Sequence, residues 1–88
     1  MKSNQHWCVY VIRCSDGSLY TGITIDVARR FQQHTAGTGA KYFRGRSPEA
    51  VVYLEHQHTR STAGTRERQI KAMSRAEKDE LILTHCNR

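Results

Sequence analysis

Hydrophobic and polar positions in the first part of the chain predict a β-hairpin followed by a helix. Two apolar runs, WCVYVIRC and SLYTGI, flank the turn SDG, and an Asp-Gly between apolar runs is a strong hairpin signal. After Ile23 the pattern becomes helical, with Asp26 as the expected N-cap and Gly37 as the expected stop. This hairpin and helix contain most of the residues that could carry chemistry.

The length of the turn decides which side chains share a face of the hairpin. A two-residue loop would place Tyr10 and Tyr20 on opposite faces, because strand side chains alternate. A three-residue loop with a left-handed glycine would pair Cys14 with Ser18, set Tyr10 opposite Gly22 and bring both tyrosines to one face. We favour the longer loop because it also gathers one apolar face for a core: Val9, Val11, Leu19 and Ile23.

With the longer loop, two phenols lie around the notch left by Gly22, which suggests a site. The alternative is that tyrosines suit strands and glycines suit turns, with no chemistry implied. In the helix, Val27 and Phe31 are four residues apart and are expected to face the core. Arg30 and His34 are also four apart, on a neighbouring stripe that can lie beside the hairpin.

The segment at 35–48, TAGTGAKYFRGRSP, predicts a loop with one helical turn near 40–43, because it holds three glycines and the only proline. Glycines let a backbone approach phosphates closely, and cations neutralise them. The alternative is a solvated basic loop. No GxxxxGK[ST] occurs, so nucleoside triphosphate hydrolysis is unsupported. The expected nucleic-acid contacts, from this loop and the flanking helices, are Arg29, Lys41, Arg44, Arg46 and Lys71.

The rest of the chain predicts one strand and two helices. Residues 50–56 alternate well enough to pair with the hairpin and complete a three-stranded sheet. Residues 61–73 read as a helix with Ser61 as a candidate N-cap. Ser74 and Glu77 match a capping box that starts a final helix through Leu83. His56 and His58 could share a strand face and bind a metal with a third ligand, although no such ligand is evident in the sequence.

Composition narrows the class of protein. Eighty-eight residues allow one small domain at 1–88, with its core at about 7–83, and the formal net charge of +6 favours a polyanionic partner, nucleic acid first. No long apolar stretch supports a membrane role. The segment MKSNQHW lacks the apolar region of a signal peptide, so we expect a cytoplasmic protein. Three cysteines without a CxxC argue for reduced thiols.

Taken together, these residues resemble the GIY-YIG nuclease superfamily, in particular its small single-domain bacterial members. The two tripeptides of that family stand here as CVY at 8–10 and YTG at 20–22, separated by the Asp-Gly turn. Arg30 follows Tyr20 by ten residues, at the spacing of the family's catalytic arginine, and His34 follows four later. The resemblance covers about 7–83 and implies an α+β fold, with a three-stranded antiparallel sheet flanked by helices.

The resemblance also implies an activity, cleavage of a nucleic-acid phosphodiester with one divalent metal, Mg²⁺ or Mn²⁺. By similarity, Tyr10 takes a proton from the attacking water and Tyr20 orients that water or a phosphate oxygen. Arg30 holds the scissile phosphate with its planar fork. His34 contacts phosphate or assists proton transfer, and Glu67 holds the metal. The alternative for Glu67 is a surface ion pair with Lys71.

Two positions depart from the family's pattern. Cys8 replaces the first glycine of the first tripeptide. This change concerns the conformational freedom of the backbone there and not a reacting group. Ile23 stands where some relatives place a lysine or a small polar residue, so any proton shuttle there is absent or supplied by another group.

The leading function is a metal-dependent endonuclease acting on DNA, expected as a monomer. Low sequence specificity is expected, because no residues remain for a separate target-choosing domain, and the shape or single-strandedness of the substrate would then decide. A role in DNA repair follows by association only. The alternatives are a non-catalytic nucleic-acid-binding module of the same fold, or a structural or protein-interaction domain.

Overall fold

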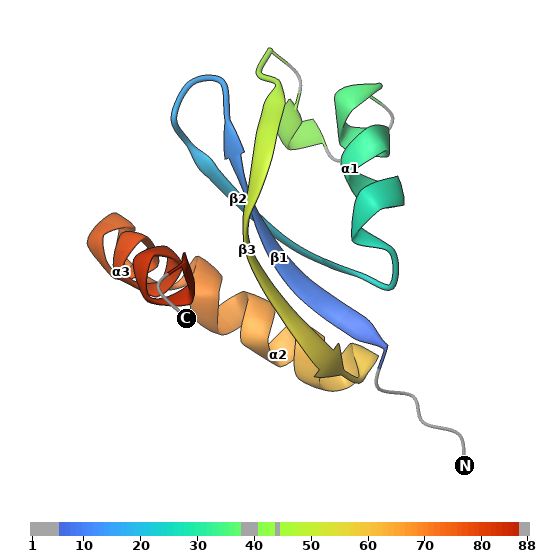
Figure 1. Ribbon diagram of the computed structural model, residues 1–88, viewed down its shortest axis with the longest axis vertical. Coiled ribbons are helices and arrows are strands. Elements are labelled where there is room, and N and C mark those ends of the chain that lie inside the picture. Colours follow the sequence, from blue (N-terminus) through green and yellow to red (C-terminus); the bar gives the residue numbers. More distant parts are fainter. Residues whose placement is uncertain (1–5, 38–40, 44, 87–88) are drawn as a thin grey trace.

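A three-stranded antiparallel sheet forms the centre of the computed structural model, which describes residues 6–37, 41–43 and 45–86 (Figure 1). The strand order is β2-β1-β3, so β1 is central and the other two strands are edges. The strands are β1 (Trp7–Cys14), β2 (Leu19–Thr24) and β3 (Pro48–His58). The helices are α1 (Val27–Thr35), the short 3₁₀ helix η1 (Lys41–Phe43), α2 (Arg60–Lys71) and α3 (Arg75–Cys86). The expected α+β class with a helix-flanked antiparallel sheet is confirmed.

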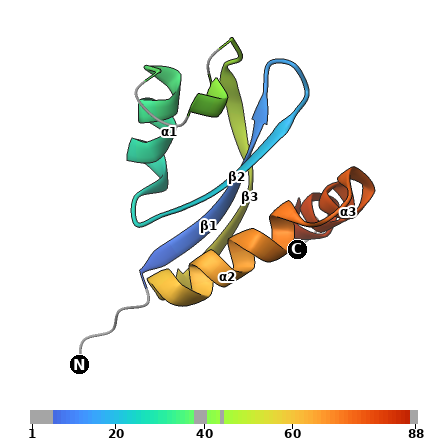
Figure 2. The same cartoon turned by 180° about the vertical axis from the view of Figure 1, so that it is seen from behind.

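Helices cover both faces of the sheet. The two opposite views show α1 on one side of the strands and α2 on the other (Figures 1 and 2). The core under α1 contains buried Tyr10, Ile12, Cys14 and Phe43. The core under α2 and α3 contains buried Val9, Val11, Tyr53, Ala63 and Ile70, with Leu19 and Ile23 packed against it. Alternation along β1 therefore separates a tyrosine face from an aliphatic face.

The hairpin has the three-residue turn. The amide of Gly17 donates to the carbonyl of Cys14 at 2.9 Å, and the amide of Cys14 donates to the carbonyl of Ser18 at 2.9 Å. Gly17 has φ +85°, the left-handed conformation that the loop requires. The resulting register sets Tyr10 opposite Gly22. The longer loop, favoured from the sequence, is confirmed.

The third strand is longer and more irregular than the pattern predicted. It spans Pro48–His58 and not only 50–56, and its pairing with β1 shifts register at three places. At one of them His56 and Gln57 together lie opposite Cys8, and Gln57 adopts φ +64°. Such a bulge reverses the alternation of side chains beyond it.

The two histidines of β3 consequently have different partners and do not form a common site. His56 Nδ1 lies 3.6 Å from the thiol of Cys8, while His58 Nε2 donates to Glu55 at 2.8 Å. Within the described ranges, no three His, Cys, Asp or Glu side chains converge to hold a metal ion. The possibility that His56 and His58 share a face and bind a metal is therefore not realised, because the bulge lies between them.

Helix boundaries follow local capping chemistry. The carboxylate of Asp26 accepts from the amide of Arg29 at 3.0 Å, as expected for the N-cap of α1. The predicted capping box of Ser74 and Glu77 is present, with bonds of 2.8 and 3.1 Å. For α2, however, the N-cap is Thr59 and not Ser61, because Thr59 forms a reciprocal capping box with Thr62.

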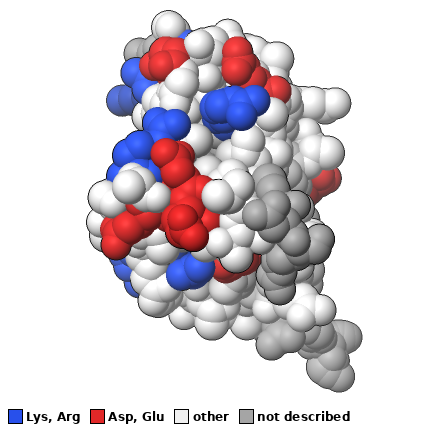
Figure 3. All heavy atoms as spheres, turned by 60° about the vertical axis from the view of Figure 1, so that its left-hand side comes forward, with Lys and Arg blue, Asp and Glu red and all other residues white. Residues whose placement is uncertain are grey.

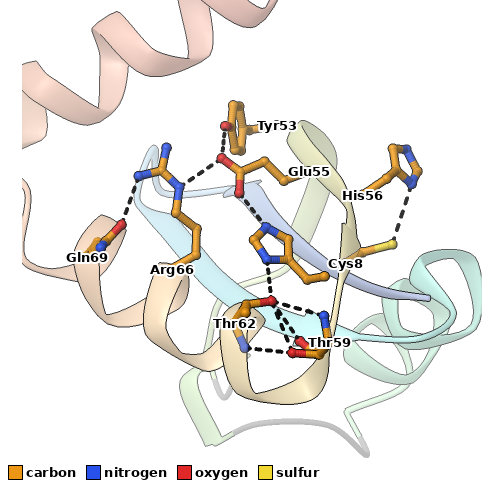
Figure 4. A network of polar contacts seen from close by, with 9 residues as sticks. Cys8, Tyr53, Glu55, His56, Thr59, Thr62, Arg66 and Gln69 are labelled. Atoms are coloured by element: carbon orange, nitrogen blue, oxygen red, sulfur yellow. Dashed lines mark hydrogen bonds and ion pairs between the residues drawn. The ribbon is translucent and has the colours of Figure 1, made fainter. Parts of the chain in front are cut away.

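A polar network around Glu55 fixes α2 against β3 (Figure 4). The carboxylate of Glu55 accepts hydrogen bonds from the hydroxyl of Tyr53, from Arg66 Nε at 2.8 Å and from His58 Nε2 at 2.8 Å. The other ring nitrogen of His58 lies 3.0 Å from the hydroxyl of Thr62, at the first turn of α2. Burial by itself would raise the pKa of Glu55, but these hydrogen bonds hold it below its ordinary value.

We expect Gly22→Ala to destabilise the protein by about 1–3 kcal/mol, because a methyl group there would lie 2.5 Å from the hydroxyl oxygen of Tyr10. Gly64→Ala is the matched control. A Cβ at position 64 would meet only Arg68, at 3.8 Å, so helix propensity should increase stability by up to about 1 kcal/mol. Urea denaturation of both variants checks this, and a Gly22→Ala variant as stable as wild type would contradict the packing.

We expect Glu55→Gln to flatten the acid branch of the stability curve. A carboxylate whose pKa is lowered in the folded state contributes stability above its unfolded value of 4.5, and this contribution is lost as pH falls through the folded value. Urea midpoints between pH 3 and pH 7, with m-values held in common, measure it. Glu49→Gln, which changes a half-exposed partner of Arg13, serves as the control. Equal acid sensitivity of both variants would contradict the role of Glu55.

Candidate active site

Tyr10 lies at the centre of the candidate site, where the register of the hairpin places it. Its side chain is 1% exposed, and its ring passes over Gly22 on the neighbouring strand. Tyr20 lies diagonally from it, with ring centroids 6.2 Å apart. The two phenols are therefore together on the α1 side of the sheet, as the three-residue turn predicted.

His34 reaches Tyr10 from α1. Its Nε2 lies 2.9 Å from the hydroxyl oxygen of Tyr10, and both residues are 1% exposed. The ring also packs on Phe43, with centroids 4.3 Å apart. Within the described residues, His34 Nδ1 is buried without a hydrogen-bond partner, which costs about 1–3 kcal/mol. Stability alone therefore does not account for a histidine at this position.

The Tyr10–His34 pair is held uncharged. Burial and the proximity of Tyr20 raise the pKa of Tyr10 to about 12, against the opposing influence of Arg30. Burial, followed by the positive charge of Arg30, lowers the pKa of His34 to about 4. At neutral pH both rings are consequently neutral. Transfer of the phenol proton to the imidazole is therefore unfavourable in the free protein.

Arg30 lies at the border between this buried pair and solvent. Its Nη1 donates to the side-chain oxygen of Gln33 at 2.9 Å, and its charge acts on the pKa of both Tyr10 and His34. Arg30 and Arg29 line a surface hollow of about 370 Å³ between α1 and β2. The remaining lining residues are Trp7, Ile23, Thr24, Ile25, Asp26 and Gln33.

Glu67 approaches from α2, on the other side of the sheet. It is near enough to Tyr10 for its negative charge to raise the pKa of that phenol. Its carboxylate pairs with Lys71 at 3.1 Å, one turn along the helix, and its side chain is 22% exposed. The surface ion pair considered as an alternative is thus present, and so is proximity to Tyr10.

The other cationic candidates are more dispersed. Lys41 is exposed on η1, and Lys71 lies on α2 beside Glu67. Arg46 lies 4.2 Å from the ring centroid of Tyr42 and 3.5 Å from the carboxylate of Asp16, so its charge is partly used within the protein. Arg44 lies outside the described residues.

The sequence pattern did not predict several of the side chains that line the site. Gln33 partners Arg30, and Tyr42 and Phe43 of η1 pack on the ring of Tyr20, at centroid distances of 5.1 and 4.9 Å. The signal for Gln33 was available, since it follows Arg30 by three residues on the same helix. The packing of Tyr42 and Phe43 on Tyr20 joins residues far apart in the sequence, so no local sequence pattern predicted it.

The ligand preferences of divalent cations indicate which residue of the site could hold one. Mg²⁺ and Mn²⁺ prefer carboxylate oxygen, and Mg²⁺ keeps several waters and commonly uses one or two carboxylates together with substrate phosphates. Glu67 supplies one partly exposed carboxylate, whose charge acts on Tyr10. This donor set fits a cation held jointly with substrate and water, and it does not resemble a closed site built from several protein ligands.

Comparison with known proteins identifies the family to which the chain belongs. The model of the GIY-YIG catalytic domain matches residues 6–80, and the chain belongs to this family. More particularly, the chain is similar to UPF0213 proteins. It is 51% identical to one from Haloquadratum walsbyi over 89% of this chain and 88% of that protein, and 45% identical to one from Cronobacter sakazakii over 89% and 82%.

Two solved structures agree with the fold. The solution structure of a UPF0213 protein from Bacillus halodurans is 41% identical, covers 89% of this chain and 83% of that one, and gives a TM-score of 0.57. The solution structure of an E. faecalis protein is 34% identical, covers 100% and 94%, and gives a TM-score of 0.64. Among the described residues, none of the helices has the length and apolar character needed to cross a bilayer.

We expect His34→Gln to remove part of the pH dependence of stability between pH 6.5 and about 4. In this window the unfolded histidine takes up a proton that the folded site refuses, so the wild-type free energy of unfolding falls as pH falls. Chemical denaturation across this range measures the slope. His6→Gln, which changes an exposed histidine, is the control. Equal slopes for wild type and His34→Gln would show that His34 is not held neutral.

Proposed function

We propose that the protein is a metal-dependent endonuclease that hydrolyses phosphodiester bonds of DNA. The observation that carries this proposal is the buried Tyr10–His34 hydrogen bond of 2.9 Å, with Arg30 and Glu67 both acting electrostatically on Tyr10. A surface that only binds nucleic acid needs cations, and it has no use for a buried neutral phenol–imidazole pair. Membership of the GIY-YIG family supports a nuclease-type activity.

Hydrolysis of a phosphodiester needs an activated water, neutralisation of the charge that develops on phosphorus, and stabilisation of the leaving oxygen. Arg30 is the group to grip the scissile phosphate, because it lines an open hollow while remaining next to Tyr10. Its planar fork can bind two phosphate oxygens at once. Tyr20 lies beside Tyr10 and is placed to orient water or a phosphate oxygen.

Tyr10 would accept a proton from the attacking water, and His34 would accept the phenol proton through the existing hydrogen bond. With a pKa of about 12, Tyr10 is too weakly acidic for this in the free protein. A divalent cation on Glu67, when bound, would supply positive charge that favours the phenolate and stabilises the leaving oxygen. Glu67 must then exchange its ion pair with Lys71 for that cation.

Low sequence specificity is part of the proposal. The candidate contacts, Arg29, Arg30, Lys41 and Lys71, are cations that suit phosphates, and phosphate contacts carry no sequence information directly. Selection would then depend on the shape or strandedness of the substrate.

We expect wild type to cut labelled DNA only with Mg²⁺ or Mn²⁺. Glu67→Gln and Arg30→Lys should each lose at least about 10²-fold in rate, because the first loses the carboxylate that would hold the cation and the second loses the planar fork that grips the phosphate. Single-stranded, duplex and branched DNA, and RNA, are tested in parallel. Arg75→Gln, which changes an exposed ion pair with Asp79 on α3, should retain activity. Salt-sensitive binding without cutting by any of the proteins would instead establish a binding module.

A further inference from the structure

A second hollow of about 510 Å³ lies between α2 and β2, and nothing in the proposed catalytic chemistry uses it. It shares one wall with the hollow of Arg30, since Ile23 lines both. The other lining residues all belong to α2: Arg60, Ser61, Gly64, Thr65 and Arg68.

The two arginines of this hollow differ from the other cations of α2. Arg66 pairs with Glu55 at 2.8 Å, and Lys71 pairs with Glu67 at 3.1 Å. Within the described residues, neither Arg60 nor Arg68 lies within ion-pair distance of a carboxylate. Arg60 lies over the ring of Trp7, 5.6 Å from its centroid, and Arg68 donates to the hydroxyl of Thr65 at 3.3 Å. Their charges are therefore available to an anionic ligand.

Gly64 keeps the floor of the hollow open between these arginines. A glycine inside a helix costs about 1 kcal/mol relative to alanine. Packing does not demand it, because a Cβ at this position would meet only Arg68 Nη1, at 3.8 Å. Residues 60, 64 and 68 are four apart and follow one stripe of α2, so the missing side chain lies between the two guanidinium groups.

Charge is distributed unevenly among the helices. α2 carries four cationic residues and one acidic residue, and α1 carries Arg29 and Arg30 without an acidic residue. α3 carries three acidic residues and two cationic ones. The side of the molecule that carries α3 accordingly mixes acidic and basic groups (Figure 3). The cationic hollows lie on either side of β2.

The two hollows meet at edge strand β2, because α1 walls one, α2 walls the other and Ile23 lines both. A ligand that contacts both passes over Ile23 at the edge of the sheet formed by β2. A flexible single strand can follow this short path over the edge of the sheet, whereas duplex DNA, with a persistence length of about 150 base pairs, bends sharply only at a cost in free energy.

We propose that the hollow of Arg60 and Arg68 binds the phosphodiester backbone of a single strand that continues from the scissile phosphate around the β2 edge. Arg60 and Arg68 each neutralise one phosphate, and the hydroxyls of Ser61 and Thr65 are placed to donate to the same backbone. The inference rests on the proposed function for the nature of the ligand. It adds that the substrate is unpaired on one side of the cut.

The test is binding of a labelled single-stranded oligonucleotide, and of the matching duplex, by fluorescence anisotropy in EDTA over a range of salt. The double variant Arg60→Gln/Arg68→Gln is compared with Arg13→Gln/Arg75→Gln, which removes two charges that pair with Glu49 and Asp79 elsewhere. For the single strand we expect the salt slope of the first variant to be shallower by about 1.4, at about 0.7 for each phosphate that is no longer neutralised. For the duplex the two variants should behave alike.

A third variant separates the shape of the hollow from its charge. Gly64→Gln fills the floor, leaves the net charge unchanged and raises helix propensity, so it is expected to fold. It should weaken binding of the single strand several-fold with little effect on the duplex. Single-strand binding equal to wild type in Gly64→Gln, or equal salt slopes for the two double variants, would overturn the inference.

Cleavage by the same proteins distinguishes the two proposals. If wild type cuts and Arg60→Gln/Arg68→Gln cuts and binds like its control, the second hollow is refuted and the nuclease stands. If no protein cuts with either metal but the difference in salt slope is present, the nuclease is refuted and the hollow stands as a single-strand binding site.

Discussion

The contact between the ring of Tyr10 and the backbone of Gly22 is the constraint on which the site depends. Only a glycine permits it, since a Cβ would lie 2.5 Å from the phenol oxygen. By crossing over β2, Tyr10 brings its hydroxyl toward the edge of the sheet, where His34 from α1 reaches it and Glu67 from α2 acts on it. Two helices on opposite faces thereby act on one atom.

The stability of the site and its chemistry make opposite demands. Several polar groups at this site reduce the stability of the core. They are a buried neutral phenol, a buried imidazole with one unpartnered nitrogen, and an arginine beside both. The aromatic packing of Tyr20, Tyr42 and Phe43 offsets this with large apolar contacts. The same rings limit access of water to His34 and leave Arg30 as the solvent-facing member of the group.

Sequence predicted those features that local chemistry determines. The Asp-Gly turn, the alternation of Tyr10 and Tyr20 and the caps at Asp26 and Ser74 depend on residues within a few positions of one another. Bulges in β3 depend on how two distant strands match, so the divergence of His56 and His58 left no trace in the pattern. The pairing of Arg46 with Asp16 likewise joins segments thirty residues apart, which composition alone could not reveal.

The network at Glu55 has a consequence beyond holding a helix in place. Arg66, which it grips, and Glu67, which acts on Tyr10, are adjacent residues of α2 and project about 100° apart around its axis. Holding Arg66 on β3 therefore fixes how α2 is rotated about its own axis, and with it the direction in which Glu67 projects. The interactions of Glu55 at the β3 edge of the sheet thus help to set the direction of Glu67, a carboxylate that they do not contact.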